Sequence, residues 1–202
     1  MTVSVDPGDV LWFWLGNLDG DGLADEPLRQ RWWRKDDAFD QEIRGKFEPI
    51  WQAIMANERE AWLEQPHSRL AYLIVLDQFS RNMFRGTPQA FAGDARALKA
   101  AADGVETGVD QRLHGHERVF FYMPFMHSEE LAMQERCVDL FAAFRDETTG
   151  RVNEAVAGNV DFAKRHLVIV ERFGRFPHRN EVLGRKSTPN ELEFLRQPGS
   201  SF

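Results

Sequence analysis

The sequence predicts an all-α fold in which helix pairs are joined by short loops. Three observations lead to this prediction. Apolar residues recur at steps of three and four along most of the chain, as on one face of a helix. Proline beside a capping residue marks expected helix starts, as at residues 6–7 and 87–88. No segment of useful length alternates apolar and polar residues as a half-buried strand does.

The first expected helix starts at Asp6-Pro7 and includes the apolar residues 10–15. Residues 17–28 then form a polar connection with part of a calcium-loop pattern. Position twelve of that pattern is Leu28 instead of a bidentate Glu, so an ordinary solvated connection is the favoured interpretation.

A short helix is expected over residues 27–33, and a longer one starts at Asp36 or Asp37 and continues to Ile54. Pro49 lies inside this second pattern. Because proline removes a helical hydrogen bond, it predicts a kink or a break there.

The chain is organised around residues 70–85. The first seven of them are all apolar or aromatic, which indicates a helix that is covered on every side. Asp77 and Arg81 continue an apolar line of this helix, and a charge there is costly unless it is paired. We therefore expect them to form an i,i+4 ion pair, either purely structural or part of a ligand site. Asn82 and Arg85 crowd the same helix end and favour a site that binds an anion.

Further helices are expected over residues 91–105, from residues 128–130 to Phe144, over 152–173 and over 191–195. In the third of these, His166 falls on the stripe that should face the core.

A basic segment follows in this acidic chain of net charge −7. Seven Lys or Arg stand against two Glu between residues 164 and 186. Because phenylalanines are interspersed with the charges, we expect the loop at residues 172–190 to dock on the core with its rings buried and its arginines lining a cleft. Guanidinium groups in such a cleft would suit a carboxylate or a phosphate.

Histidines supply the candidate acid–base groups. His127 and Glu130 lie three residues apart across a helix start, as a base and its orienting carboxylate would. The alternative is that Glu130 caps the helix and His127 fills a polar gap. With His166 and His178 the ligand types would suit zinc or iron, but no H-E-x-x-H or paired E-x-x-H motif is present, so we predict neither a metal nor a cofactor.

Composition limits the classes of function. With 43% hydrophobic residues the chain can bury a full core, and we expect one all-α domain over residues 1–202. Its negative charge argues against nucleic-acid and membrane-surface partners. A single cysteine fits the reducing cytoplasm, and the apolar run at residues 10–15 is too short for an export signal.

Residues 73–91, 121–134 and 172–195 resemble the signature blocks of a bacterial family, domain of unknown function 924. The resemblance covers residues 10–195, and Ser80 stands where the family commonly has proline. It implies a tetratricopeptide-repeat-like arrangement of antiparallel helix pairs, superhelical or bundle-like. The family has no established activity, so the function has to be inferred from the residues.

The leading hypothesis is a pocket for a small anionic ligand, a phosphate or a carboxylate, with catalysis left open. The arginines would hold the anion, the asparagines would orient it, and His127 or His178 would move a proton. The pocket residues are Asp77, Arg81, Asn82, Arg85, His127, Glu130, His166, Arg175, His178, Arg179 and Asn180. The alternatives are a scaffold that binds a peptide or protein partner between helix pairs, and a purely structural ion-pair lattice.

Overall fold

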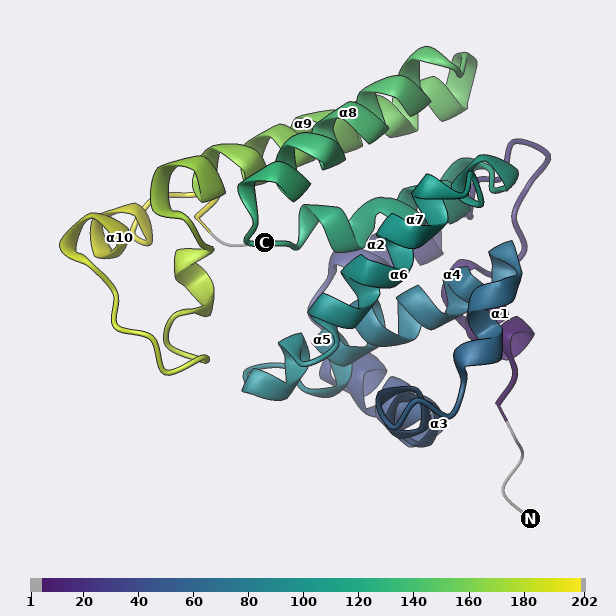
Figure 1. The fold of residues 1–202 in the computed structure, drawn as a ribbon, viewed down its shortest axis with the longest axis horizontal. Coiled ribbons are helices and arrows are strands. Elements are labelled where there is room, and N and C mark those ends of the chain that lie inside the picture. Colours follow the sequence, from purple (N-terminus) through teal and green to yellow (C-terminus); the bar gives the residue numbers. More distant parts are fainter. Residues whose placement is uncertain (1–4, 201–202) are drawn as a thin grey trace.

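The computed structural model describes residues 5–200, and within them it contains helices and turns but no β-strand, so the predicted all-α class is confirmed (Figure 1). None of the helices in this part of the chain is both long and apolar enough to cross a membrane. The α-helices are α1 (Pro7–Leu15), α2 (Glu26–Trp33), α3 (Asp37–Met55), α4 (Pro66–Ile74), α5 (Ser80–Met83), α6 (Asp94–Glu106), α7 (Gly115–Met126), α8 (Leu131–Asp146), α9 (Gly150–Phe173) and α10 (Pro189–Phe194).

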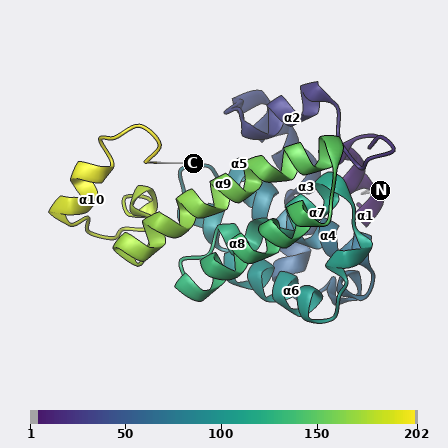
Figure 2. The same cartoon turned by 90° about the horizontal axis from the view of Figure 1, so that it is seen from above.

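The centre of the molecule is the helical run from α4 into α5. Helices α1, α3, α6 and α7 pack around it, and α8 and α9 form an antiparallel pair that contacts α7 (Figures 1 and 2). Every residue of the predicted buried stretch from Leu70 to Leu76 is at most 1% exposed. Burial on all sides is what an apolar run without a polar face requires.

Capping residues set the helix ends where the sequence predicts them. The Asp6 side chain accepts from the Asp9 backbone N–H at the start of α1, and Asp36 does the same for two amides at the start of α3. Such bonds satisfy amides that have no partner inside the helix. The expected break at Pro49 is wrong, because α3 continues through it. Phe47 and Ile50 on either side are buried in the same core, and this burial outweighs the lost backbone hydrogen bond.

The central run changes its winding between α4 and α5. Residues Val75–Phe79 form a π-helical turn, a conformation often found at functional sites. Ser80 follows this turn, and its hydroxyl accepts from Trp51 Nε1 at 2.7 Å. The turn contains Asp77, and so it decides where that carboxylate points.

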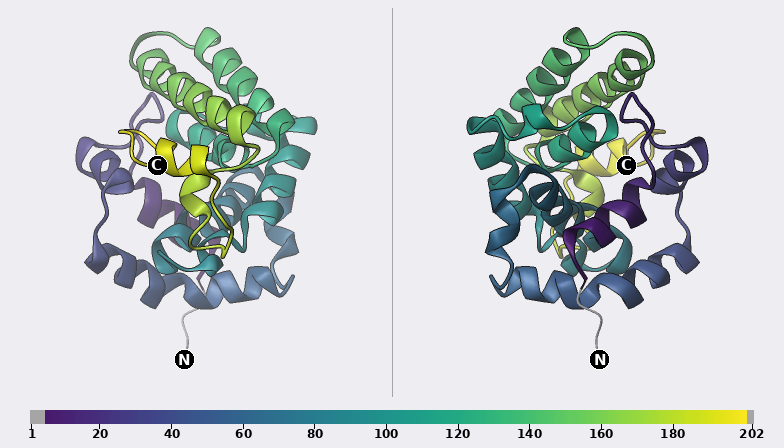
Figure 3. Two further views of the ribbon diagram at one scale, coloured as in Figure 1. Left: turned by 90° about the vertical axis from the view of Figure 1, so that its left-hand side faces the viewer. Right: turned by 90° about the vertical axis from the view of Figure 1, so that its right-hand side faces the viewer.

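The chain after α9 forms what we call the C-terminal segment, residues 174–195. Gly174 ends α9 in the left-handed region with φ of 67°, which glycine adopts without strain. The segment lies at one end of the molecule, and the left view of Figure 3 looks directly onto it. Phe176 joins Ile169 and Val170 in a small apolar cluster separate from the main core.

The polar connection between α1 and α2 binds a side chain of the protein itself. Arg151 at the start of α9 lies 2.9 Å from Asp19 and 3.2 Å from Asp21. The two aspartates of the partial calcium pattern are thus used in ion pairs with an arginine.

We expect the packing of α9 to depend on its inner face. Replacing Val160, which is 2% exposed, with alanine should lower the free energy of unfolding by about 1.5–3 kcal/mol, because buried methyl groups are lost and a cavity remains. The matched control is Val168→Ala on the same helix, where the side chain is 58% exposed and the expected change is within about 0.5 kcal/mol. Urea unfolding measures both. Equal losses would contradict this packing.

Candidate functional site

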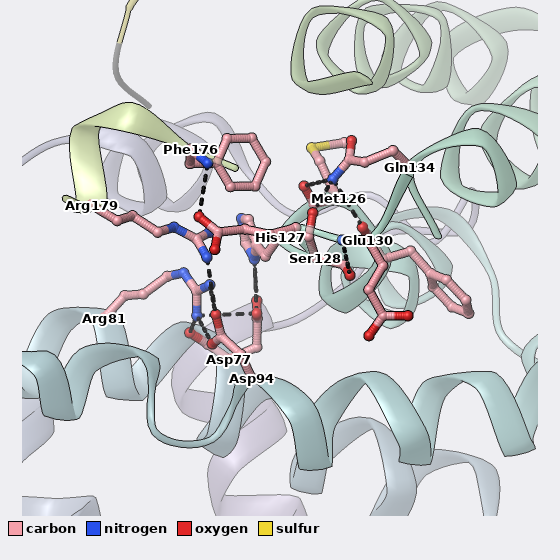
Figure 4. Close-up of polar contacts among 12 residues, drawn as sticks. Asp77, Arg81, Asp94, Met126, His127, Ser128, Glu130, Gln134, Phe176 and Arg179 are labelled. Carbon is pink, nitrogen blue, oxygen red and sulfur yellow. Dashed lines mark hydrogen bonds and ion pairs between the residues drawn. The ribbon is translucent and has the colours of Figure 1, made fainter. Parts of the chain in front are cut away.

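The site is built around the carboxylate of Asp77, which is 1% exposed (Figure 4). Its Oδ1 lies 2.7 Å from His127 Nδ1 and 3.2 Å from Arg81 Nη1, and its Oδ2 accepts from Gln78 Nε2 at 2.7 Å. Burial acts to raise the pKa of Asp77, but the charge of Arg81 and the bond from His127 outweigh it and hold that pKa well below its usual range. The carboxylate is therefore ionised, and the expected Asp77–Arg81 pair is present.

His127 follows α7 and turns its Nδ1 toward Asp77 (Figure 4). Because a carboxylate only accepts hydrogen bonds, Nδ1 carries the proton and Nε2 keeps its lone pair. Burial and the nearby Arg81 charge lower the pKa of His127 despite the opposing effect of Asp77, so the ring is neutral at pH 7. Its side chain is 17% exposed, which leaves it within reach of a ligand.

The expected partnership of His127 with Glu130 is wrong. Asp77, from the central helix, is the carboxylate that orients the ring. Helix α7 ends at Met126 and α8 starts at Leu131, so His127 and Glu130 lie across a non-helical turn and do not share a face. Glu130 is exposed at the N-cap of α8, where it makes no side-chain capping bond.

Gln134 fixes the turn that carries His127. Its side chain is fully buried, and its Nε2 donates to the backbone carbonyls of Met126 at 2.7 Å and Ser128 at 2.6 Å (Figure 4). A buried amide that bonds both sides of the turn holds the His127 backbone in place. This role could not be predicted, because the residue pattern around Gln134 is that of an ordinary helix.

Arg81 is fully engaged by two carboxylates. Besides Asp77, it binds Asp94 through both terminal nitrogens, at 2.9 and 3.0 Å. Asp94 stands in the first turn of α6 and was not among the predicted site residues. A carboxylate is stabilised in the first turn of a helix, and this position is the one feature of the sequence that could have drawn attention to Asp94.

Arg179 is buried but weakly paired. It is 6% exposed, and its guanidinium carbon lies 4.8 Å from the ring centroid of Phe91 and 4.6 Å from that of Phe176. Nη1 lies 3.4 Å from Asp94, and Nε has no hydrogen-bond partner among the described residues. Burial and the neighbouring Arg81 charge lower the pKa of Arg179 to about 10. It is thus a positive group whose donors are largely unused.

Two more imidazoles lie next to Arg179. The ring of His166 is 6.3 Å from that of His127, and Phe176 contacts both His166 and His178, at centroid distances of 5.5 and 5.7 Å. Burial lowers the pKa of His166 to about 3, and burial with the Arg179 charge lowers that of His178 to about 4. Within residues 5–200, no group of three or more His, Cys, Asp or Glu side chains is arranged to hold a metal ion.

The expectation that Asn82 and Arg85 share one pocket with Arg175, His178 and Arg179 is wrong. Arg85 binds Asp40 of α3 through two nitrogens, at 2.7 and 2.9 Å, and donates to Asn82 Oδ1. Both residues line a different cavity of about 840 Å³ between α3 and residues 82–89. One step along a helix turns a side chain by about 100°, so Asn82 points away from the side that Arg81 occupies.

Within the C-terminal segment, Arg175 and Asn180 are used internally. Arg175 forms a two-point ion pair with Glu191, at 2.6 and 2.8 Å, and Asn180 donates to Ser187 at 3.1 Å. These contacts shape the segment, and they place neither side chain with His127.

Glu129 attaches the segment to the corner between α7 and α8. It accepts from both terminal nitrogens of Arg185, at 2.6 and 3.0 Å, and from the backbone N–H of Phe176 at 2.7 Å. Burial opposes ionisation of Glu129, but these bonds outweigh it and lower its pKa. These bonds of Glu129 hold Phe176, and with it Arg179, beside His127.

The likeness to known proteins extends over nearly the whole chain. Residues 10–199 match the family DUF924, described as bacterial protein of unknown function, and the chain belongs to this family. A solved structure of a protein of unknown function, ATU0120 from Agrobacterium tumefaciens, is 37% identical to it, with a TM-score of 0.78 over 94% of this chain and 96% of that one. Among curated proteins none matches. The tetratricopeptide-like arrangement stays a prediction.

We predict that acid weakens the fold through its buried imidazoles. His166 has an ordinary pKa near 6.5 when unfolded and about 3 when folded, so below pH 6.5 the unfolded chain binds a proton that the folded chain does not. The contribution of His166 to the free energy of unfolding is therefore fully present above pH 6.5 and falls as the pH is lowered toward the folded-state pKa. At pH 5 this loss should be about 2 kcal/mol. Urea unfolding at pH 7 and pH 5 measures this loss. In His166→Phe, the decrease in the free energy of unfolding between the two pH values should be smaller than in the wild type. An unchanged loss would contradict the assignment.

Proposed function

We propose that this DUF924 protein binds a small anionic ligand, a phosphate or a carboxylate, at Arg179 beside His127 and His178, and that His127 moves a proton on the bound ligand. The observation that carries the proposal is Arg179, a buried arginine with unused donors beside a neutral imidazole. A buried cation of this kind is stabilised by an oxyanion that completes its hydrogen bonds.

The two arginines of the site differ in how well they are neutralised. Arg81 forms ion pairs with Asp77 and Asp94, so its charge is neutralised within the fold. Arg179 shares Asp94 at the longer distance of 3.4 Å. The guanidinium also packs on the rings of Phe91 and Phe176, and its planar fork of donors suits two oxygens of one anion. Arg179 is therefore the proposed anion holder, and Arg81 the structural partner of Asp77.

His127 has the features of a general base. Asp77 holds its Nδ1 proton and would stabilise the imidazolium that forms when Nε2 takes a proton. The lowered pKa keeps Nε2 free to accept one at neutral pH. A ligand hydroxyl or a water next to the anionic group is the chemical partner that this arrangement suits.

The purely structural hypothesis is favoured by one observation, the mutual pairing of Arg81 with Asp77 and Asp94. Under that hypothesis Arg179 serves to lock the C-terminal segment, and added anions stabilise nothing. The scaffold hypothesis gains no specific contact from the described residues. One experiment separates binding from a structural lattice.

The test is anion-dependent thermal stability at constant ionic strength, with phosphate and acetate compared against chloride. Wild-type protein should be stabilised by about 2.7 kcal/mol when the anion is at 100 times its Kd. Arg179→Gln should remove the response. The matched control is Arg172→Gln, an exposed arginine whose guanidinium also lies over a phenyl ring, Phe173, at 4.7 Å, and it should respond like the wild type.

A wild type that responds to phosphate and acetate no more than to chloride would contradict the proposal, and so would a full response by Arg179→Gln. Circular dichroism confirms that each variant is folded. His127→Gln should keep the anion response, because this residue acts on the ligand's proton and Arg179 holds its charge.

A further inference from the structure

The proposed anion holder, Arg179, is covered by residues that belong to a different part of the chain. Its side chain is 6% exposed and its Nε is buried. Phe91 and Asp94, which its guanidinium contacts, lie outside the C-terminal segment, whereas Arg179 lies inside it. An anion from solvent reaches a buried donor only when part of the protein moves. Separation of the segment from Phe91 and Asp94 would uncover the guanidinium.

The C-terminal segment has internal bonds that connect its beginning to its end. Arg175, the first residue after Gly174, forms a two-point ion pair with Glu191 and donates to the backbone carbonyl of Lys186 at 3.0 Å. Thr188 and Glu191 form a capping box at the start of α10. Because these bonds lie within the segment, it can move as one body without breaking them.

The segment is attached to the rest of the molecule by few apolar contacts. Among the described residues, the main core includes none of residues 174–195. Phe176 and Phe194 pack instead with Ile169 and Val170 at the end of α9, and the segment lies beyond that end of the helix (Figures 1 and 2). A unit with few buried contacts to the core is the kind that opens while the rest of the fold stays intact.

A flexible joint precedes the segment, and a carboxylate of another helix pair holds it. Gly174 ends α9 in the left-handed region, and a Cβ there would meet no described residue within 4 Å apart from its chain neighbours, so the joint has room to turn. Glu129, at the corner between α7 and α8, binds the segment through the Arg185 guanidinium and the Phe176 N–H, at 2.6–3.0 Å.

We propose that the C-terminal segment is a lid on the anion site, which opens about Gly174, uncovers Arg179 and is held shut by Glu129. The open state admits the ligand. In the closed state the ligand contacts Arg179 on the lid beside His127 on the body of the protein, so bound ligand favours closure. The part of the ligand in this cycle rests on the proposed function, and the opening of the lid does not.

The experiment is amide hydrogen exchange of the full-length protein, measured by mass spectrometry of its peptides. In Glu129→Gln the amides of residues 177–195 should exchange together about 10- to 100-fold faster, because bonds to a charged group are weakened, while α3 and α4 keep their wild-type rates. The matched control is Glu130→Gln. The Glu130 side chain is exposed and makes no capping bond, so this variant should exchange like the wild type.

Two further measurements keep the test independent of one variant. Arg185→Gln removes the same ion pair from the other side, so it should speed exchange of the same residues, and the double variant should add little to either single change. Modification of Arg179 by phenylglyoxal, located by mass spectrometry, should accelerate in Glu129→Gln, whereas the exposed Arg172 should react at one rate in every variant.

The outcomes separate the lid from the proposed function. Exchange of residues 177–195 that is equal in Glu129→Gln and Glu130→Gln would overturn the lid, as would equal acceleration in α3 and α4 or an unchanged modification rate of Arg179. Added phosphate should slow exchange of the segment in the wild type and not in Arg179→Gln. If the latch variants open the segment as expected but neither phosphate nor acetate slows its exchange, the proposed function fails and the lid stands.

Discussion

The constraint on which the site depends is an ionised carboxylate, Asp77, at the end of a helix buried on all sides. A buried charge of this kind is tolerated only when it is paired, and removing one partner of such a pair costs about 3–5 kcal/mol. Asp77 draws Arg81 from its own helix and His127 from the corner between α7 and α8. Arg81 in turn binds Asp94, and Asp94 meets Arg179. Charges of alternating sign thus connect the central helix, α6 and the C-terminal segment.

Local rules account for what could be predicted from the sequence. Burial of the central helix follows from its uninterrupted apolar run, and the pairing of Asp77 with Arg81 follows from their spacing on one helix. Caps at Asp6 and Thr188 are likewise read from neighbouring residues. The basic composition of residues 172–190 predicted a loop docked on the core, and two arginines of this loop contact other parts of the chain: Arg179 lies 3.4 Å from Asp94, and Arg185 lies 2.6 Å from Glu129.

The features that could not be predicted from the sequence depend on contacts between distant segments. His127 and Asp77 are 50 positions apart, so nothing near either residue identifies its partner, and Glu130 was chosen because it is close in sequence. Glu129 and Gln134, which position the C-terminal segment and the His127 turn, look like ordinary helix-start and helix residues. The π-helical turn has no sequence signature, and Asn82 and Arg85 after it, which were expected at the anion site, line a separate cavity beside α3.

Arg81 and Arg179 differ in how their hydrogen-bond donors are used. The guanidinium of Arg81 is paired with carboxylates of the protein, whereas Arg179 has a buried donor without a partner among the described residues. The most direct test of this account is the tautomer of His127, observed by nitrogen NMR of the imidazole at pH 7. The account predicts a proton on Nδ1, a lone pair on Nε2, and loss of this preference in Asp77→Asn. A proton on Nε2, or a freely averaging ring that Asp77→Asn does not alter, would contradict it.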